Sequence, residues 1–317
     1  MSGDARNRFY MKMTIFLIVL FTLLGAEVPS MARLDHVTAF DKDFSQQPIP
    51  RFRNKFVVGY DRGHTRLRMW DAAGNAVLEK ELNLPGAAKV AISDIAVSSE
   101  GTIAVSASAY SASGQGSAVI AWLNPRGELI RVVVTNPFAA RRVAFAPDGT
   151  LWAFGRVFDE NLRDAAHYSL LQRYDSDGRW IKSALPRSSF PTGGGAPYTN
   201  CFLTVTGDRI AVVSVTASEW VELSLEGEVL GRWPWKLDPD VIFTGVALTP
   251  NGMLFASLEN ENLGHLHRYD RASKSWNVVD TTQARGPREG FVVLGNDGDA
   301  VVARTKPPGK LAWIRVP

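Results

Sequence analysis

The sequence of 317 residues contains a single cysteine, Cys201. One cysteine excludes a disulfide within the chain and leaves no basis for a zinc site built on several thiolates. The stability of the folded protein must therefore come from its core, and a chain of this length can bury a large one. Because Cys201 stands at the start of a β-rich run, we expect it to be a small buried apolar residue.

Runs of like charge are also missing. The chain has 35 Lys and Arg against 32 Asp and Glu, a net charge of +3, and its basic residues are scattered. Nucleic-acid-binding proteins concentrate their basic residues, so we expect no nucleic-acid partner. The nucleophile-elbow motif Gly-x-Ser-x-Gly, the zinc motif His-Glu-x-x-His and the dithiol motif Cys-x-x-Cys do not occur. The sequence therefore predicts no particular reaction.

The first 32 residues combine three features of a secretory signal peptide. Arg6, Arg8 and Lys12 precede an apolar run over residues 14–24, and small residues at Ser30 and Ala32 follow. An apolar run of this length is too short for a spanning helix, which needs about 18 residues or more. We predict a signal peptide over residues 1–32, with an uncleaved N-terminal anchor as the alternative. The mature chain is then periplasmic or secreted, without a membrane span.

The rest of the chain repeats one pattern of four β-rich runs. A first tight turn recurs in forms such as Pro147-Asp148-Gly149 and Pro250-Asn251-Gly252, and a second ends at Gly74, Gly127, Gly178 and Gly227. Pro presets the φ angle of such a turn, Asp or Asn caps it, and Gly takes the positive φ. Successive copies lie about 44 to 59 residues apart, which is the period of propeller blades. We find no extended helical periodicity after residue 32.

These repeats predict an all-β fold in which residues 33–317 form one β-propeller of six four-stranded antiparallel blades, with five or seven blades as alternatives. The units lie near residues 55–84, 87–134, 142–185, 200–233, 244–280 and 289–316. The last unit supplies only about three strands. We expect residues 34–44 to provide its fourth strand and so to close the ring.

Two segments, residues 143–155 and 171–183, resemble the NHL-type and related six-bladed propellers of bacterial exported proteins. The resemblance is carried by the turn sequence over residues 145–152 and by residues 171–179, and residues 246–255 and 266–270 repeat both. It implies the architecture of the chain from residue 55 onward. The Asn-x-Arg element of NHL repeats is missing, and Trp70-Asp71 is an isolated pair rather than a WD series. Gluconolactonase-like propellers hold a divalent metal with one Glu, one Asn and one Asp from separate blades, and the sequence pattern does not assign those three ligands here.

Binding residues are expected on the face that carries the longer connections, because variable loops on a rigid scaffold usually carry function. In a propeller these connections join the second and third strands of a blade, and they also join one blade to the next. The connections within blades lie near residues 60–65, 106–117, 157–167, 259–265 and 305–310. The candidate ligand-binding residues are Tyr60, Arg62, His64, Tyr110, Asp159, Glu160, His167, Tyr198 and Arg288.

A possible divalent metal ion has four candidate ligands: Asp240, Glu259, Glu261 and His265. Oxygen and imidazole groups are ligands that calcium or zinc accepts, but the spacing does not complete a coordination shell. We expect a monomeric binding module of the cell envelope for a small ligand, glycan or protein. The alternatives are a metal-dependent hydrolase or lactonase with an axial ion, and a structural propeller without a ligand.

Overall fold

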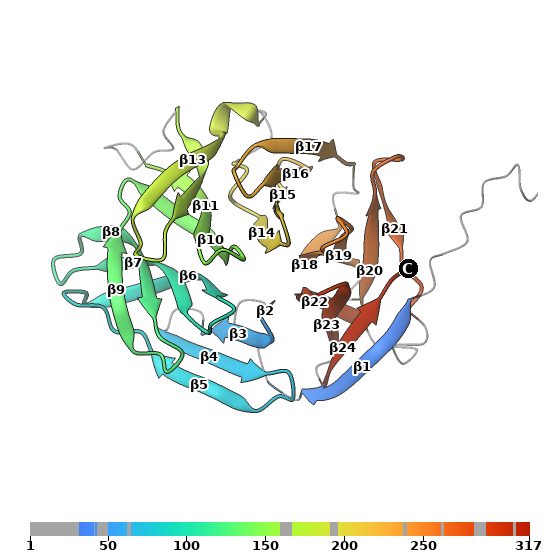
Figure 1. Ribbon diagram of the computed structural model, residues 1–317, viewed down its shortest axis with the longest axis horizontal. Helices are drawn as coiled ribbons and strands as arrows, with labels where there is room; N and C mark the ends of the chain where they lie inside the picture. Colours follow the sequence, from blue (N-terminus) through green and yellow to red (C-terminus); the bar gives the residue numbers. More distant parts are fainter. Residues whose placement is uncertain are drawn as a thin grey trace, which may run out of the picture.

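The computed structural model describes residues 32–40, 42, 50–61, 65–158, 167–190, 196–236, 240–260, 263–281, 290–306 and 309–317. The predicted signal peptide therefore lies outside the described residues, apart from Ala32. The described residues form six antiparallel sheets of four strands, arranged in a ring (Figure 1). The prediction of a six-bladed propeller is confirmed. No helix within this part of the chain is long and apolar enough to cross a membrane.

Each blade follows the order of the chain from an inner to an outer strand. The first contains β2 (Arg51–Arg53), β3 (Phe56–Tyr60), β4 (Arg66–Asp71) and β5 (Ala76–Glu81). The second contains β6 (Lys89–Val97), β7 (Ile103–Tyr110), β8 (Gly116–Leu123) and β9 (Leu129–Val134). The third contains β10 (Phe138–Phe145), β11 (Leu151–Val157), β12 (Ser169–Tyr174) and β13 (Trp180–Pro186), and a 3-10 helix (Arg187–Ser189) follows it.

The remaining blades repeat this order. The fourth contains β14 (Cys201–Thr206), β15 (Arg209–Ser214), β16 (Glu219–Ser224) and β17 (Val229–Pro234). The fifth contains β18 (Ile242–Leu248), β19 (Leu254–Asn260), β20 (Leu263–Asp270) and β21 (Ser275–Val278). The sixth contains β22 (Gly290–Asp297), β23 (Ala300–Lys306), β24 (Gly309–Arg315) and, from the other end of the described chain, β1 (Arg33–Phe40).

Strand β1 closes the ring, as predicted for residues 34–44, although it ends at Phe40. It pairs antiparallel with β24 from Arg33 opposite Arg315 to Phe40 opposite Gly309 (Figure 1). The buried Phe40 ring packs edge-on against Trp70 of the first blade, with 5.9 Å between ring centroids. Ala32 is also buried, and its N–H donates to the Asp280 carbonyl at 3.1 Å. A chain cleaved after Ala32 would lack that contact.

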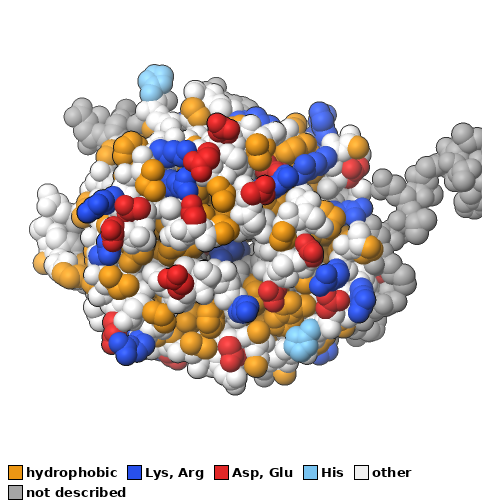
Figure 2. Space-filling model, in the orientation of Figure 1, with side chains coloured by type: hydrophobic (Ala, Val, Ile, Leu, Met, Phe, Trp, Pro, Cys, Tyr) orange, Lys and Arg blue, Asp and Glu red, His pale blue; other side chains and the backbone are white. Residues whose placement is uncertain are grey.

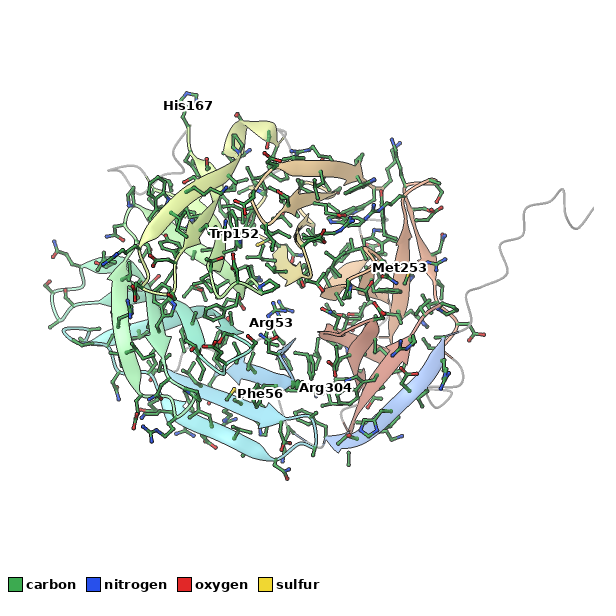
Figure 3. The ribbon with its side chains drawn as sticks, viewed as in Figure 1. Arg53, Phe56, Trp152, His167, Met253 and Arg304 are labelled. Carbon is green, nitrogen blue, oxygen red and sulfur yellow. The ribbon has the colours of Figure 1, made fainter. Side chains whose placement is uncertain are left out.

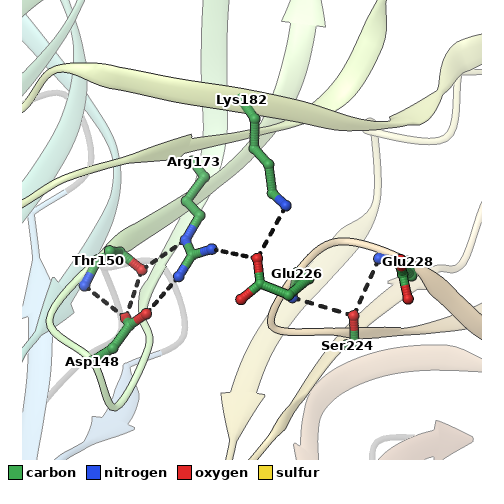
Figure 4. Close-up of polar contacts among 7 residues, drawn as sticks. All are labelled: Asp148, Thr150, Arg173, Lys182, Ser224, Glu226 and Glu228. Atoms are coloured by element: carbon green, nitrogen blue, oxygen red, sulfur yellow. Dashed lines mark hydrogen bonds and ion pairs between the residues drawn. The ribbon is translucent and has the colours of Figure 1, made fainter.

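The core lies between neighbouring blades because both faces of each sheet are apolar. Trp152, Trp220 and Phe255 are fully buried there. Charged side chains join the blades at the turn end. Arg173 donates to Thr150 at 3.0 Å and pairs with Asp148 at 2.5 Å and Glu226 at 3.3 Å, which links the third blade to the fourth (Figure 4).

Two inner strands begin earlier than predicted. The sequence placed the first unit from residue 55 and the third from residue 142, whereas β2 begins at Arg51 and β10 at Phe138. The sequence pattern missed these starts because arginines interrupt the apolar alternation in both strands. Each strand contacts the packed core on one side and borders the axis of the ring on the other. The connection predicted over residues 106–117 is shorter, because β7 extends to Tyr110 and β8 begins at Gly116.

Four inner strands contain a β-bulge at the same place. Their register shifts lie at Ile92/Asp94 in β6, Ala140/Arg142 in β10, Phe243/Gly245 in β18 and Val293/Gly295 in β22. Such bulges change the direction in which side chains point. The residue after each bulge contacts the next blade.

The chemical type of this residue differs around the ring. A Cβ on Gly245 would lie 1.7 Å from the Val293 carbonyl oxygen, so these two inner strands nearly touch. The equivalent residues of β6 and β10 are charged. The Asp94 carboxylate accepts the Val143 N–H at 3.0 Å, and Arg142 Nε donates to the Cys201 carbonyl at 2.8 Å. Polar side chains thus join the inner strands on the side of blades two to four.

Candidate functional site

A cavity of about 480 Å³ lies on this polar side of the ring. Its arginines are Arg141, Arg142 and Arg156, and its aromatic walls are Tyr60 and Tyr198. Ile92, Ser93 and Thr199 complete the lining. Tyr60 and Arg156 stand near the ends of second strands, and Tyr198 precedes a first strand. The cavity is therefore on the face of the longer connections, opposite the tight turns. Seen along the ring, the centre of the molecule is hollowed, and Lys or Arg surface lies within the hollow (Figure 2).

Two arginines stand at the outer part of the cavity. Arg141 is the bulged residue of β10 and is exposed. Arg156, near the end of β11, is held by two aromatic rings, with its guanidinium carbon 4.0 Å from the Phe158 centroid and 5.1 Å from the Tyr198 centroid. Its Nε is buried and has no hydrogen-bond partner among the described residues. Ring contacts of this kind hold a guanidinium group in place while leaving its in-plane N–H groups available.

Further arginines lie behind this wall, nearer the axis. Arg53 reaches across the ring and donates from Nη2 to the Leu203 carbonyl of the fourth blade at 3.2 Å (Figure 3). Arg51 stands over the Phe202 ring, also of the fourth blade, at 5.0 Å. Both residues keep part of their surface accessible although protein surrounds them. Residues that border a narrow channel have this combination.

Burial and mutual repulsion act on these charges. Burial, and to a smaller extent the neighbouring Arg142 charge, lowers the pKa of Arg51 to about 10. Burial likewise lowers the pKa of Arg141, with a smaller contribution from Arg156. An arginine with a pKa near 10 is still protonated at neutral pH, so the cavity is cationic. Asp94 provides an opposing charge near Arg51 and Arg142.

Cys201 is a structural residue beneath the cavity. Its side chain is fully buried, and its thiol donates to the Tyr198 carbonyl at 3.3 Å. Burial raises the pKa of the thiol to about 11, so it is neutral at pH 7. The prediction of a small buried residue at this position is confirmed.

The predicted ligand-binding residues fall into three groups. Tyr60 and Tyr198 line the same cavity, and the Tyr60 hydroxyl donates to the Ser93 carbonyl at 2.7 Å. Tyr110 and His167 are exposed and outside the cavity lining, and Figure 3 places His167 at the periphery, away from Arg53. The remaining candidates lie outside the described residues: Arg62, His64, Asp159, Glu160 and Arg288.

The candidate metal ligands are not brought together in the part that is described. Glu259 is paired with Lys306 of the sixth blade, Asp240 is exposed, and His265 is half-buried in β20. Glu261 lies outside the described residues. Across the described ranges, no three His, Cys, Asp or Glu side chains are grouped as a metal site requires.

The arginines in and behind the cavity were not predicted from the sequence, because the candidate residues were chosen from the longer connections. Arg51, Arg53, Arg141 and Arg142 belong to inner strands, and Arg156 lies near the end of a second strand. The available signal was the occurrence of Arg51, Arg53 and the Arg141–Arg142 pair just before apolar runs. An isolated charge in a buried strand is costly unless it is paired or reaches water, so such residues mark a channel or a site.

Comparison with protein-family models finds no match, and comparison with curated proteins finds none either. Solved structures show the fold. A candidate exported protein of Bacteroides fragilis is 13% identical, with a TM-score of 0.53 over 92% of this chain and 97% of the other. A Bacteroides caccae protein of unknown function is 12% identical, with a TM-score of 0.51 over 78% and 81%. The aldose sugar dehydrogenase of Streptomyces coelicolor, bound to PQQ, is 14% identical, with a TM-score of 0.50 over 90% and 98%.

Proposed function

We propose that the protein is an exported binding module that holds a small ligand in its axial cavity, on the face of the longer connections. Export to the periplasm or beyond is inferred from the basic, apolar and small-residue pattern of residues 1–32. A relation to NHL-type exported propellers is part of the same proposal and rests on the turn sequences over residues 145–152 and 171–179.

The cavity is the observation that supports this function. Its volume of about 480 Å³ falls within the range of small-molecule sites, which is about 300 to 1,000 Å³. Two aromatic walls face three arginines, a combination of apolar surface and a few polar groups that is typical of ligand sites. An inner strand supplies Arg141 and Arg142, so this part of the site is preformed on the sheet, and the segment before β14 adds Tyr198 and Thr199.

The lining favours binding over hydrolysis. The described residues that line the cavity include no carboxylate, imidazole or thiol that could act as a general base or nucleophile. The nearby Asp94 is buried, and its carboxylate already accepts the Val143 N–H. Cys201 is protonated and buried. The cavity lining does supply the hydroxyl groups of Ser93 and Thr199, but no described lining residue is a carboxylate or imidazole that would activate them.

A cavity-filling substitution tests the binding site. Thr199 is exposed at the cavity, so Thr199→Trp should fill it without disturbing the core. Ligands would first be found by thermal shift of the mature protein with a chemically diverse small-molecule library. We expect Thr199→Trp to weaken their binding at least tenfold, measured by calorimetry. Asp208→Trp, at an exposed turn on the opposite face, is the control and should bind normally. Undiminished binding to Thr199→Trp would refute the site.

Metal removal tests the hydrolase or lactonase alternative. Because the described residues offer no group of three ligands, we expect EDTA to leave the melting temperature of the purified protein unchanged. Elemental analysis should find less than one divalent ion per chain. A stoichiometric ion, together with a lower melting temperature in EDTA, would favour the metal-dependent enzyme instead.

A further inference from the structure

We propose that the axial cavity recognises its ligand through an acidic group, a carboxylate or a phosphate, which binds to Arg141, Arg142 and Arg156. This inference rests on the proposed function and specifies the chemistry of the ligand. The organic remainder would lie against Tyr60 and Tyr198.

The first argument is a contrast between two sets of arginines in the same ring. At the turn end, Arg173 pairs with Asp148 and Glu226, and Arg271 pairs with the buried Glu222 at 2.7 Å. Arg232, at the outer part of the fourth blade, pairs with Glu219 at 2.5 Å. In contrast, none of the five arginines in and behind the cavity forms an ion pair with a carboxylate of the described residues. This fold pairs its partly buried arginines elsewhere, so the unpaired set calls for an external anion.

The second argument is the supply of free donors. The Nε groups of Arg156 and Arg53 are both buried and have no hydrogen-bond partner within the described ranges. The Nε groups of Arg68, Arg131 and Arg209, which pair with carboxylates, are also buried without a partner, so this feature alone does not distinguish the cavity. The rings of Phe158 and Tyr198 hold Arg156 in place at the cavity wall. An oxyanion in the cavity would accept from the Nη groups of this fixed guanidinium rather than from its buried Nε.

The third argument is the balance of charge. Five guanidinium groups lie close together, and Asp94 is the carboxylate that opposes them among the described residues. Burial, and then repulsion between the guanidinium groups, lowers the pKa of Arg51 and of Arg141, whereas the Asp94 carboxylate helps to raise the pKa of Arg142 against the effect of burial. An anion would relieve the repulsion. Guanidinium groups match the paired oxygens of carboxylates and phosphates, and such charge-assisted hydrogen bonds are the strong ones.

The dimensions of the cavity limit the class of anion. A space of about 480 Å³ accommodates a small organic acid or a phosphate ester. It is a local hollow beside the axis rather than a basic stripe across the surface, so it does not suit a nucleic-acid backbone. We therefore assign the ligand to small organic anions.

The test measures binding of simple oxyanions to the mature protein by calorimetry and thermal shift. Citrate and inorganic phosphate serve as probes for the two kinds of acidic group, and sodium chloride at matched ionic strength controls for salt. We expect one or both oxyanions to bind and to raise the melting temperature beyond the chloride control. The probe that binds more tightly identifies the acidic group of the ligand as a carboxylate, for citrate, or as a phosphate. An equal effect of chloride would overturn the inference.

Arginine variants locate the anion. Arg141→Gln and Arg142→Gln are each expected to weaken binding of the preferred probe at least tenfold, and Arg141→Lys should recover part of it because it keeps the charge. Arg179→Gln makes the same charge change at an exposed turn of the third blade and should bind as the unsubstituted protein does. Equal loss in Arg179→Gln would indicate a general charge effect and would also overturn the inference.

Failure of this inference is distinguishable from failure of the proposed function. If library ligands are displaced by Thr199→Trp but are neutral and insensitive to Arg141→Gln, the cavity binds ligands and the anion inference is wrong. If no ligand, charged or neutral, depends on Thr199, the proposed function itself is wrong.

Discussion

A chain that begins at Lys42 instead of Ala32 is expected to lose the cooperative unfolding of the complete propeller. The shortened chain lacks β1, so the backbone groups of β24 that pair with it from Gly309 to Arg315 have no partner. An unpaired strand edge exposes N–H and C=O groups and promotes aggregation. Circular dichroism, thermal unfolding and gel filtration of the two chains would show the difference.

A point substitution separates ring closure from the loss of a segment. Phe40 is 1% exposed and packs with Phe52, Trp70 and Trp313 at the junction of the first and last blades. Phe40→Ala in the full chain should lower the free energy of unfolding by about 3–5 kcal/mol. Val37→Ala, which changes a partly exposed residue of the same strand, should have a much smaller effect.

A peptide provides the rescue experiment for the shortened chain. A synthetic peptide covering residues 32–42 should bind to the exposed edge of β24 and restore cooperative unfolding, because strand addition uses the same backbone hydrogen bonds. If the chain from Lys42 unfolds at the temperature of the longer chain without this peptide, β1 is not needed for closure.

Replacement of Glu222 is the second change with a large expected effect. This glutamate of β16 is fully buried, and its two carboxylate oxygens separately contact Arg209 of the same blade and Arg271 of the fifth blade. Arg271 in turn lies 4.7 Å from the Trp220 ring and 4.3 Å from the Trp233 ring. The carboxylate therefore holds together a cluster that joins two blades.

Glu222→Leu should lower the free energy of unfolding by about 3 kcal/mol, measured by denaturant titration. Breaking a buried ion pair costs about 3–5 kcal/mol when a charge is left without compensation. We expect the lower end because the Arg209 and Arg271 side chains are 34% and 40% exposed and recover part of their hydration. Glu228→Gln, at an exposed turn position of the same blade, should change stability by less than about 0.5 kcal/mol. A similarly small effect at Glu222 would show that the pair does not join the blades.

The blade pattern could be predicted from the sequence because it is encoded by local interactions. Tight turns depend on residues adjacent in the chain, and Gly101 and Gly149 adopt the positive φ angles that their turns require, 84° and 82°. Alternating apolar residues then define the sheets, and repetition defines the ring. The closing strand was also predictable, because a final unit with three strands needs a fourth.

The cavity could not be predicted in the same way, because distant parts of the chain form it. Loop position led to Tyr60 and Tyr198, but Arg141 and Arg142 come from a bulged inner strand and Arg156 from a second strand, and the local pattern does not reveal that these side chains meet. Contact between Arg53 and the Leu203 carbonyl joins residues 150 positions apart.

The sequence by itself therefore determined the repeat, the strand content and the face of the longer connections, all of which depend on residues that are neighbours in the chain. Only the tertiary structure decided which charged residues meet. Gly245 and Gly295 bring inner-strand backbones of neighbouring blades into direct contact, whereas the Asp94 and Arg142 side chains bridge the inner strands of blades two to four. The cavity lies beside these bridged strands, where ring closure brings Arg141, Arg142 and Arg156 together with two tyrosines from other blades.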